Sequence, residues 1–191
     1  TVSGNYIGTD ISGTQELANE RGGISINGSD NTIGGTADGA RNVISGNADY
    51  GIAIWHSGTD NNVIAGNLIG TDATGAILVG NIGNNVNINQ GATNTIVGGT
   101  GAFEGNVIAG GVDGITIWSS ATTGTIVQRN FLGTDPAGAL DWGNSGSGVV
   151  VSGGANETLI GGTNANEANV IAFNNFGVAV WDWNADNKTI L

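Results

Sequence analysis

The chain has no cysteine, no methionine, a single proline and only four lysine or arginine residues among its 191. The absence of cysteine excludes disulfide bonds, thiolate catalysis and cysteine-ligated zinc. Sixteen Asp and Glu residues leave a formal net charge of -12 at pH 7, whereas nucleic acids and anionic lipids bind clusters of Lys and Arg. From this charge we expect no nucleic-acid partner. Because a run of about 18 apolar residues is also absent, we expect no membrane insertion.

Glycine, by contrast, is abundant, with 36 residues, and 39% of the chain is hydrophobic. The glycines follow no three-residue period and proline is almost absent, which excludes a collagen helix. A disordered chain would carry many charges and few apolar residues, but only 10% of these residues are charged. The composition therefore indicates an ordered protein.

Internal repeats organise the whole chain. The phrase Gly-Asn-Tyr-Ile-Gly-Thr-Asp at 4–10 recurs in similar form at 66–72 and 129–135. Three further phrases, Ile-Gly-Gly-Thr, Asn-Val-Ile and Gly-Ile-x-Ile-Trp, recur between these copies in the same order. We therefore expect one domain made of three units, residues 4–65, 66–128 and 129–191, with no linker between them.

Each unit divides again into two rungs of about 31 residues, because its two halves carry similar strand phrases. Within a rung we expect three short strands, for example 51–55, 62–65 and 67–70, since β-branched residues alternate there between Gly, Asn and Thr. No stretch shows apolar residues recurring at the 3.6-residue period of an amphipathic helix. Rungs of this kind pair in parallel about 4.8 Å apart. The sequence therefore predicts an all-β parallel β-helix, or solenoid, of about six rungs, with Ile52, Ile115 and Val178 stacked in its core.

Asparagine recurs at the corners of this coil. Asn suits a corner because it tolerates the left-handed conformation and bonds its own backbone, and stacked Asn side chains bond to one another along an axis. We expect turn and ladder roles at two recurring positions, Asn5, Asn67 and Asn130 at one, and Asn42, Asn106 and Asn169 at the other.

The phrases Asn-x-Ile-Gly-Thr-Asp, Asn-Val-Ile-Ser-Gly-Asn and Gly-Ile-x-Ile resemble the right-handed parallel β-helix repeats of the pectin-lyase-like superfamily. More narrowly, they look like the long repetitive surface proteins that bacteria secrete. The resemblance implies a right-handed winding and an extracellular or cell-surface location. It leaves activity open, because this superfamily includes lyases, hydrolases, adhesins and passive stalks.

The residues that such enzymes use are poorly represented. The family's lyases use Asp-ligated calcium with an Arg or Lys base, and its hydrolases use three Asp, two of them adjacent. This chain has no Asp-Asp pair and one histidine, His56, and its four basic residues fall at no matching positions of the three units. We therefore predict a non-catalytic structural or adhesive module, with a polysaccharide-binding or polysaccharide-degrading β-helix as the alternative, and we assign no catalytic residue.

Acidic residues form one recurring position, with Asp10, Asp72 and Asp135 each followed three residues later by Gly. Asp at the first and Gly at the fourth position is typical of a type I turn. The alternative is a column of Ca²⁺ ligands. Because these residues lie two rungs apart, about 10 Å, they are too distant to share one ion. The turn interpretation is favoured, so we expect no cofactor and no metal site, with Ca²⁺ at these three Asp residues as the alternative.

Tryptophan forms another column, Trp55, Trp118 and Trp181. Each follows an inward-facing Ile or Val, so the Trp side chain is expected to point outward at the end of its strand. Such a column is expected to lie under the long loops at 73–84 and 136–147, to contact another chain, or to stack on a polysaccharide.

The two ends of the chain fall at the same phase of the repeat, and neither carries a segment typical of a solenoid cap. A bare last rung would expose core residues and unpaired backbone groups. We therefore expect the solenoid to continue, either as part of a longer array or by end-to-end or lateral self-association. Screening of the net charge by salt or divalent cations should favour that association.

Overall fold

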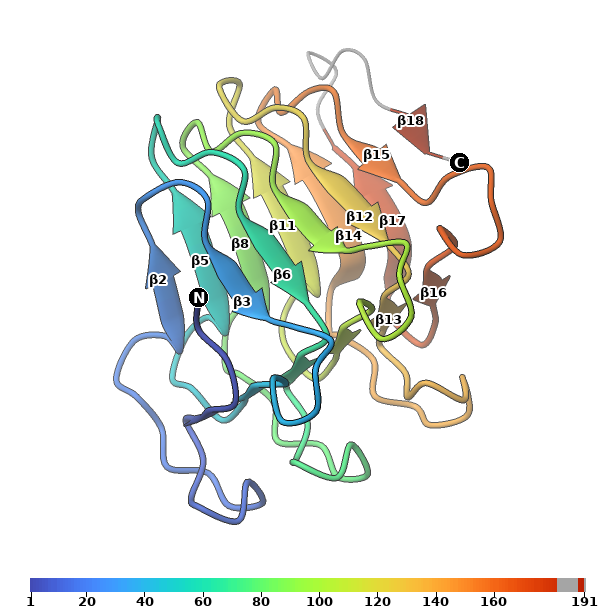
Figure 1. The fold of residues 1–191 in the computed structure, drawn as a ribbon. Coiled ribbons are helices and arrows are strands. Elements are labelled where there is room, and N and C mark those ends of the chain that lie inside the picture. The colour runs from blue at the N-terminus through green and yellow to red at the C-terminus, as the bar shows by residue number, and fades with distance from the viewer. Residues whose placement is uncertain (182–188, 191) are drawn as a thin grey trace.

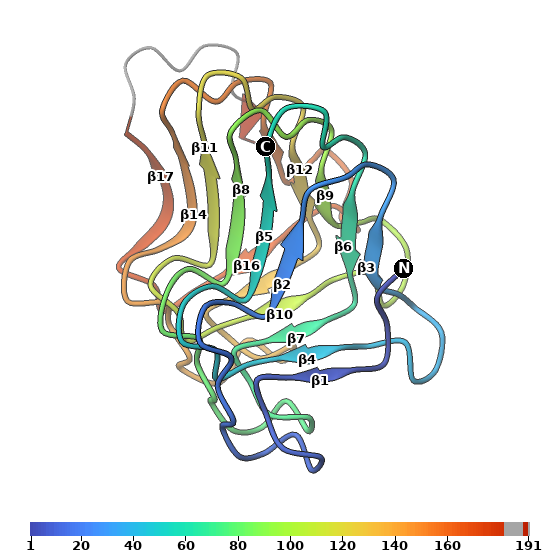
Figure 2. The same ribbon diagram turned by 90° about the vertical axis from the view of Figure 1, so that its left-hand side faces the viewer.

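In a computed structural model, which describes residues 1–181 and the backbone of 189–190, the chain winds as a coil whose sides are three parallel β-sheets of six strands each. Figure 2 shows the three sheets as three sides around a common interior. Among the described residues, no helix is long and apolar enough to cross a membrane. The predicted all-β parallel solenoid, with two coils per unit, is confirmed.

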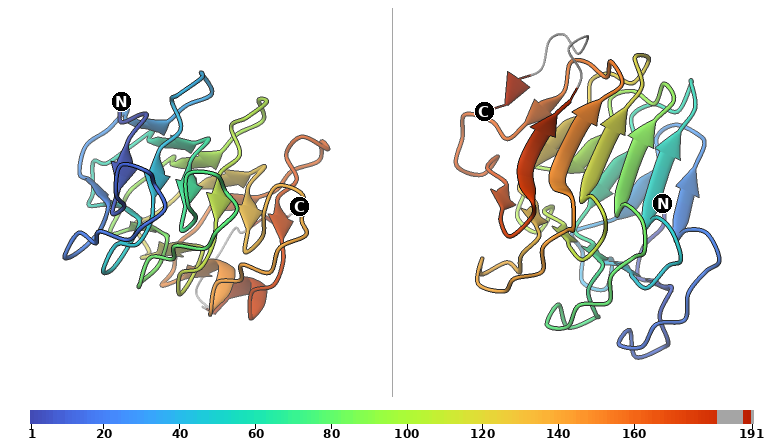
Figure 3. Two further views of the ribbon diagram at one scale, coloured as in Figure 1. Left: turned by 90° about the horizontal axis from the view of Figure 1, so that it is seen from below. Right: turned by 180° about the vertical axis from the view of Figure 1, so that it is seen from behind.

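The first sheet carries the longest strands, and Figure 3 (right) shows them side by side from β17 in red to β2 in blue. Its strands are β2 (Ile24–Ile26), β5 (Ile52–Trp55), β8 (Val86–Asn89), β11 (Ile115–Trp118), β14 (Ser147–Ser152) and β17 (Phe176–Val180).

The second and third sheets complete each coil (Figure 1). The second sheet consists of β3 (Thr32–Gly34), β6 (Val63–Ala65), β9 (Ile96–Gly98), β12 (Ile126–Gln128), β15 (Leu159–Ile160) and β18 (Thr189–Ile190). The third consists of β1 (Tyr6–Ile7), β4 (Val43–Ile44), β7 (Leu68–Ile69), β10 (Val107–Ile108), β13 (Phe131–Leu132) and β16 (Val170–Ile171). The strands expected at 51–55, 62–65 and 67–70 correspond to β5, β6 and β7.

The core is built from columns of like side chains, because strands in register place equivalent residues one above another. In the first sheet Ile52 pairs with Val86, and Val86 with Ile115. Ile115 pairs with Val149, which pairs with Val178. The predicted stack is therefore present, with residues of the alternate coils between its members. Similar columns of Ile, Val and Leu from the other two sheets fill the rest of the interior.

Coils alternate between two shapes. The corner between the third and first sheets is a long loop in the first, third and fifth coils, at 8–18, 70–80 and 133–143, and a short turn in the others. Figure 1 shows the three long loops projecting below the stack. Each begins with a glycine of positive φ; at Gly70 the φ is 86°, and an added Cβ would overlap the carbonyl oxygen of Ala109.

The long loops are fastened to the outer face of the third sheet. Trp142, from the loop of the fifth coil, is buried in a small second cluster with Val107 and Ala109 of the fourth coil. Val43 and Leu68 extend this cluster along the sheet. The middle strands of the third sheet are therefore covered on both faces, whereas the outer face of the first sheet carries no such loop.

One ladder of asparagines runs along the corner between the second and third sheets. Side-chain amide bonds of 2.9–3.1 Å join each member to the next coil. Each acceptor Oδ1 also takes the main-chain N–H of the preceding member, at 2.9–3.4 Å. The ladder comprises Asn5, Asn42, Asn67, Asn106, Asn130 and Asn169. The two positions that the sequence separates are thus one column, which alternates between the two kinds of coil.

A second asparagine ladder, which the sequence analysis missed, runs along the corner between the third and first sheets. Its amide bonds are 2.8–2.9 Å long. Its members are Asn19, Asn47, Asn81, Asn85, Asn144 and Asn174. In the fourth coil the matching position is Gly111, and an added Cβ there would lie 2.7 Å from Nδ2 of Asn85. Asn85, from the third coil, therefore fills the place that the glycine leaves.

The position of an asparagine within the first ladder should determine its energetic importance. Asn106 is fully buried. Its replacement by Ala would remove the acceptor of the Asn67 main-chain N–H, the donor to the Ile64 carbonyl and both amide bonds of the ladder at this coil. We expect Asn106→Ala to lower the free energy of unfolding by about 3 kcal/mol, because buried polar groups lose their hydrogen bonds. Asn5→Ala, at the exposed end of the ladder, should cost about 0.5 kcal/mol. Urea unfolding of both variants measures this difference, and equal losses would contradict a cooperative buried ladder.

Candidate functional site

The outer face of the first sheet presents the tryptophan column. Trp55 pairs with Asn89, which pairs with Trp118, and Trp118 pairs with Ser152. Trp181 follows Val180, which pairs with Val151, so it lies beside Ser152. The three tryptophans thus stand on alternate coils at the carboxyl ends of their strands, with small or amide side chains between them.

The long loops do not cover this column. They lie below the amino ends of the first-sheet strands (Figure 1), whereas Trp55 and Trp118 end their strands and Trp181 directly follows β17, at the opposite, carboxyl ends. Trp118 is 50% exposed and Trp181 is 59% exposed. The expected packing of these side chains under loops at 73–84 and 136–147 is therefore wrong. Contact with another chain and contact with a polysaccharide remain as the two alternatives.

Each tryptophan has a different support. The Trp55 ring packs edge-on against Tyr50, with the two ring centroids 5.7 Å apart, and its Nε1 donates to the Ser25 hydroxyl at 3.1 Å. Trp181 packs edge-on against Phe176, with the two ring centroids 6.2 Å apart. Trp118 lies over Gly153, where an added Cβ would overlap the indole ring. These contacts orient the rings while leaving the second and third of them largely open to solvent.

The sequence contains a signal for the two aromatic partners that the analysis did not use. Tyr50 and Phe176 each precede their tryptophan by five residues, and Asp113 stands at the same offset before Trp118. The Asp113 carboxylate accepts the main-chain N–H of Ser147 at 2.7 Å. The aromatic pairs of the second and sixth coils are therefore replaced by a polar contact in the fourth.

The acidic column lies in the long loops, one carboxylate to each loop. Asp72 Oδ1 accepts the main-chain N–H groups of Ala76 and Ile77 at 2.8 and 2.9 Å. Asp10 and Asp135 bond in the same way to the residues four and five positions later. In each loop the glycine three residues after the Asp donates to its carbonyl oxygen. All three carboxylates thus close the turns in which they stand.

These contacts determine the ionisation of the three carboxyl groups. The bond from the Ser12 hydroxyl is the main cause that lowers the pKa of Asp10, and the bond from the Leu140 N–H is the main cause at Asp135. Burial would raise the pKa of Asp72, but the bonds from Thr74, Ile77 and Ala76 together outweigh it and lower that pKa. Within the described residues, no three His, Asp or Glu side chains lie close enough to hold one metal ion.

Comparisons with known proteins add no relative. A scan against protein-family models, a search of curated proteins and a search of solved structures each found no match. Of the resemblance carried by the repeated phrases, the parallel β-solenoid is the part that the structure shows.

Acid should weaken the solenoid through Asp72. Because the pKa of Asp72 is lowered in the folded chain, its contribution is fully present above the unfolded pKa of about 3.9 and is lost as the pH falls through the folded value. We expect Asp72→Asn to reduce the free energy of unfolding by about 1 kcal/mol at neutral pH and to flatten its decline in acid. Urea unfolding at a series of pH values measures both effects.

A second variant separates the effect of the Asp72 charge from the effect of its hydrogen bond with Thr74. Thr74→Val keeps the carboxylate but removes the hydroxyl that donates to Asp72 Oδ2 at 2.6 Å. Its unfolding free energy should fall less than that of Asp72→Asn and keep most of the acid dependence. An acid profile of Asp72→Asn identical to that of the unmodified chain would contradict the assignment.

Proposed function

We propose that this chain is a non-catalytic structural module of an extracellular bacterial surface protein or filament, with an adhesive capacity on its outer face. The observation that carries this proposal is the continuity of the coil. All three sheets and the first asparagine ladder pass through every described coil. The second ladder stays continuous because Asn85 fills the place of Gly111. A rod built in this way gains stability from each added interface, which suits a spacer or stalk.

The net charge and the repeated phrases support an extracellular location for this rod. The net charge of -12 keeps such a rod soluble and limits its association with nucleic acid and with anionic membranes. The repeated phrases that resemble those of secreted bacterial surface proteins, within the pectin-lyase-like superfamily, support the same location.

The described stack also offers edges for a further coil. Strands β1 and β2 border it on one side and β16 and β17 on the other, so each edge presents unpaired main-chain groups. Val180 is 42% exposed, although Ile54, Ile88 and Ile117 of the same column are fully buried. A seventh coil, supplied by a longer chain or by a second copy, would bury this column and pair the edge.

Self-association should therefore depend on the edge rather than on general charge. We expect sedimentation velocity to show association that increases with salt or calcium, because screening weakens the repulsion between acidic chains. Val180→Lys should suppress it, since a charge at an open edge opposes pairing. Ile77→Lys makes the same change in charge on a long loop, where Ile77 is 56% exposed, and should leave association intact. Equal behaviour of the two variants, or a monomer under all conditions, would contradict end-to-end stacking.

Polysaccharide binding is the second candidate function, and the exposed tryptophans favour it. Rings on alternate coils are about 10 Å apart along the axis, which is similar to the repeat of a two-sugar unit. Indole faces provide large apolar contact area with little loss of conformational freedom. A linear glycan lying along the first sheet would meet Trp118 and Trp181 in succession.

Loss of the exposed rings should abolish such binding. We expect Trp118→Ala combined with Trp181→Ala to reduce retention on immobilised acidic and neutral glycans at least tenfold, whereas Tyr6→Ala should not reduce it. Tyr6 is a matched control because it is also 50% exposed but stands on the third sheet. Retention that survives the double change would remove the tryptophan column as a glycan site, and cleavage of the glycan would contradict the non-catalytic function.

A further inference from the structure

A shallow hollow lies on the corner between the second and third sheets, on a different side of the molecule from the tryptophan column. Its volume is about 320 Å³. Val107 and Phe131 of the third sheet line it, together with Phe103 and Pro136 from two loops, and Arg41 and Arg129. Two of the three arginines of this acidic chain thus face one apolar depression.

The arginines occupy one column of the solenoid. Each directly precedes an asparagine of the first ladder, Arg41 in the second coil and Arg129 in the fifth. Glycines stand at the same position in the third and fourth coils, Gly66 and Gly105. No side chain of this column therefore separates the two arginines. This match is invisible in the 62–63-residue units, because the two arginines belong to different halves of the repeat.

Phe103 is a departure from the repeat that costs stability. It stands in a turn closed by a bond from the Glu104 N–H to the Gly101 carbonyl, and the matching turn of the second coil is closed by Ala40 and Ala37. Gly39 holds the matching place there with a φ of 75°, and Phe103 has a φ of 69°. A bulky residue in this conformation is strained. Its ring is nevertheless 73% exposed, so burial of the ring in this chain does not offset the strain.

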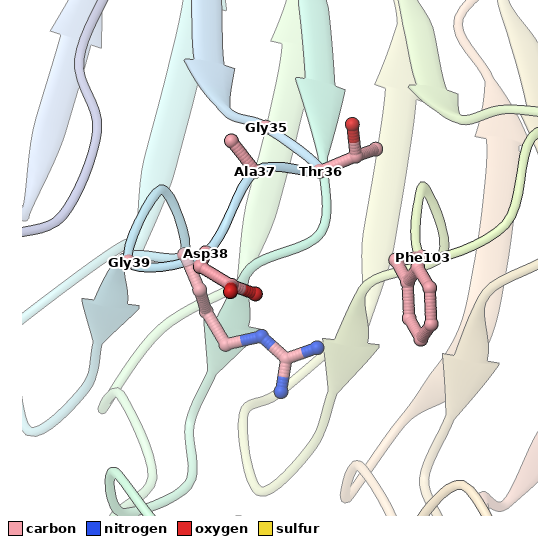
Figure 4. A pocket seen from close by; sticks show the side chains of 7 residues that line it. Gly35, Thr36, Ala37, Asp38, Gly39 and Phe103 are labelled. Atoms are coloured by element: carbon pink, nitrogen blue, oxygen red, sulfur yellow. The ribbon is translucent and has the colours of Figure 1, made fainter.

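Phe103 also borders a neighbouring hollow, together with Arg41. Figure 4 shows that hollow, with the Asp38 carboxylate on one side and the Phe103 ring on the other. The Glu104 carboxylate turns into its own loop, where it accepts the Gly101 N–H at 2.7 Å. Of the residues that line these two hollows, Asp38 is therefore the one that carries a carboxylate.

Both guanidinium groups are anchored without losing their charge. Arg41 Nε donates to the Gly66 carbonyl at 2.9 Å, and Arg129 Nη1 donates to the Asn166 carbonyl at 3.4 Å. Each bond uses one of five donors, so most of the planar donor edge stays available for an oxyanion.

We propose that this hollow binds an oxyanion carried on a ring. The carboxylate, sulfate or phosphate group bonds the free donors of Arg41, and the ring lies against Phe103, Phe131 and Pro136, with Arg129 at the far side of the hollow. Arginine binds such groups through paired donors and stacks on flat rings. Aromatic acids and sugar acids share this chemistry. The site is independent of the tryptophan column and of the edges of the stack.

The arginine side chains provide a direct measurement. Because the chain has only three arginines, Arg21, Arg41 and Arg129, their Nε–Hε signals can be followed separately by NMR in the intact chain. Titration with benzoate or glucuronate should shift the signal of Arg41 most, shift that of Arg129 less because it lines the far side of the hollow, and leave Arg21 unchanged. Benzyl alcohol, which has the ring without the charge, should bind about tenfold more weakly because it lacks the charge-assisted hydrogen bonds. Acetate, which has the charge without the ring, should bind about tenfold more weakly because it lacks the ring contact.

Variants test the two halves of the site. Arg41→Gln should weaken benzoate and glucuronate binding about tenfold, whereas Arg21→Gln should leave it unchanged. Phe103→Gly restores the residue that the repeat has at Gly39, so the thermal midpoint should not fall, while the shifts should be lost. The tighter of benzoate and glucuronate identifies the aromatic or the sugar ring as the better fit. Equal shifts with acetate and benzoate, or binding unchanged by Phe103→Gly, would overturn the proposal.

Discussion

Asparagines stacked in register hold the corners of this solenoid together. A parallel coil must return to the same path at every turn, and its corners bring main-chain groups into the interior where water does not reach them. The asparagine side chain bonds both the main chain and the same side chain of the next coil. Because a buried polar group without a partner is costly, the corners can be buried only where the column is continuous. The sheets and the apolar core follow from that register.

The second ladder shows how strictly this requirement holds. Where the fourth coil has Gly111 in place of asparagine, Asn85 from the preceding coil fills the position and bonds Asn81 on one side and Asn144 on the other. The column is therefore preserved although the sequence position is not. Loop length is less restricted, because the long loops leave the stack after one corner residue and return to the ladder at the same point.

The surface divides into regions with separate constraints. The loops cover the middle of the third sheet and the core columns repeat closely, so these parts serve the fold. The first sheet carries the exposed tryptophans, and the corner between the second and third sheets carries Arg41, Phe103 and Arg129. Phe103 keeps a strained conformation that the glycine of another coil adopts without strain. Residues that depart from the repeat at a cost to stability are the places where a binding function is expected.

The parallel solenoid, its two coils per unit and the inward columns such as Ile52, Ile115 and Val178 follow from the amino-acid sequence alone, because they depend on local alternation of residues and on a period that recurs along the chain. The sequence also indicated the turns closed by Asp10, Asp72 and Asp135 from their spacing to glycine. Four features became visible only in the folded chain. Six asparagines form one ladder, and Asn85 substitutes for Gly111 in the other. Trp118 and Trp181 are open to solvent, and Arg41 and Arg129 share a column. The reason is that coils differ in length, so residues that meet in space are separated by intervals that no single sequence period contains.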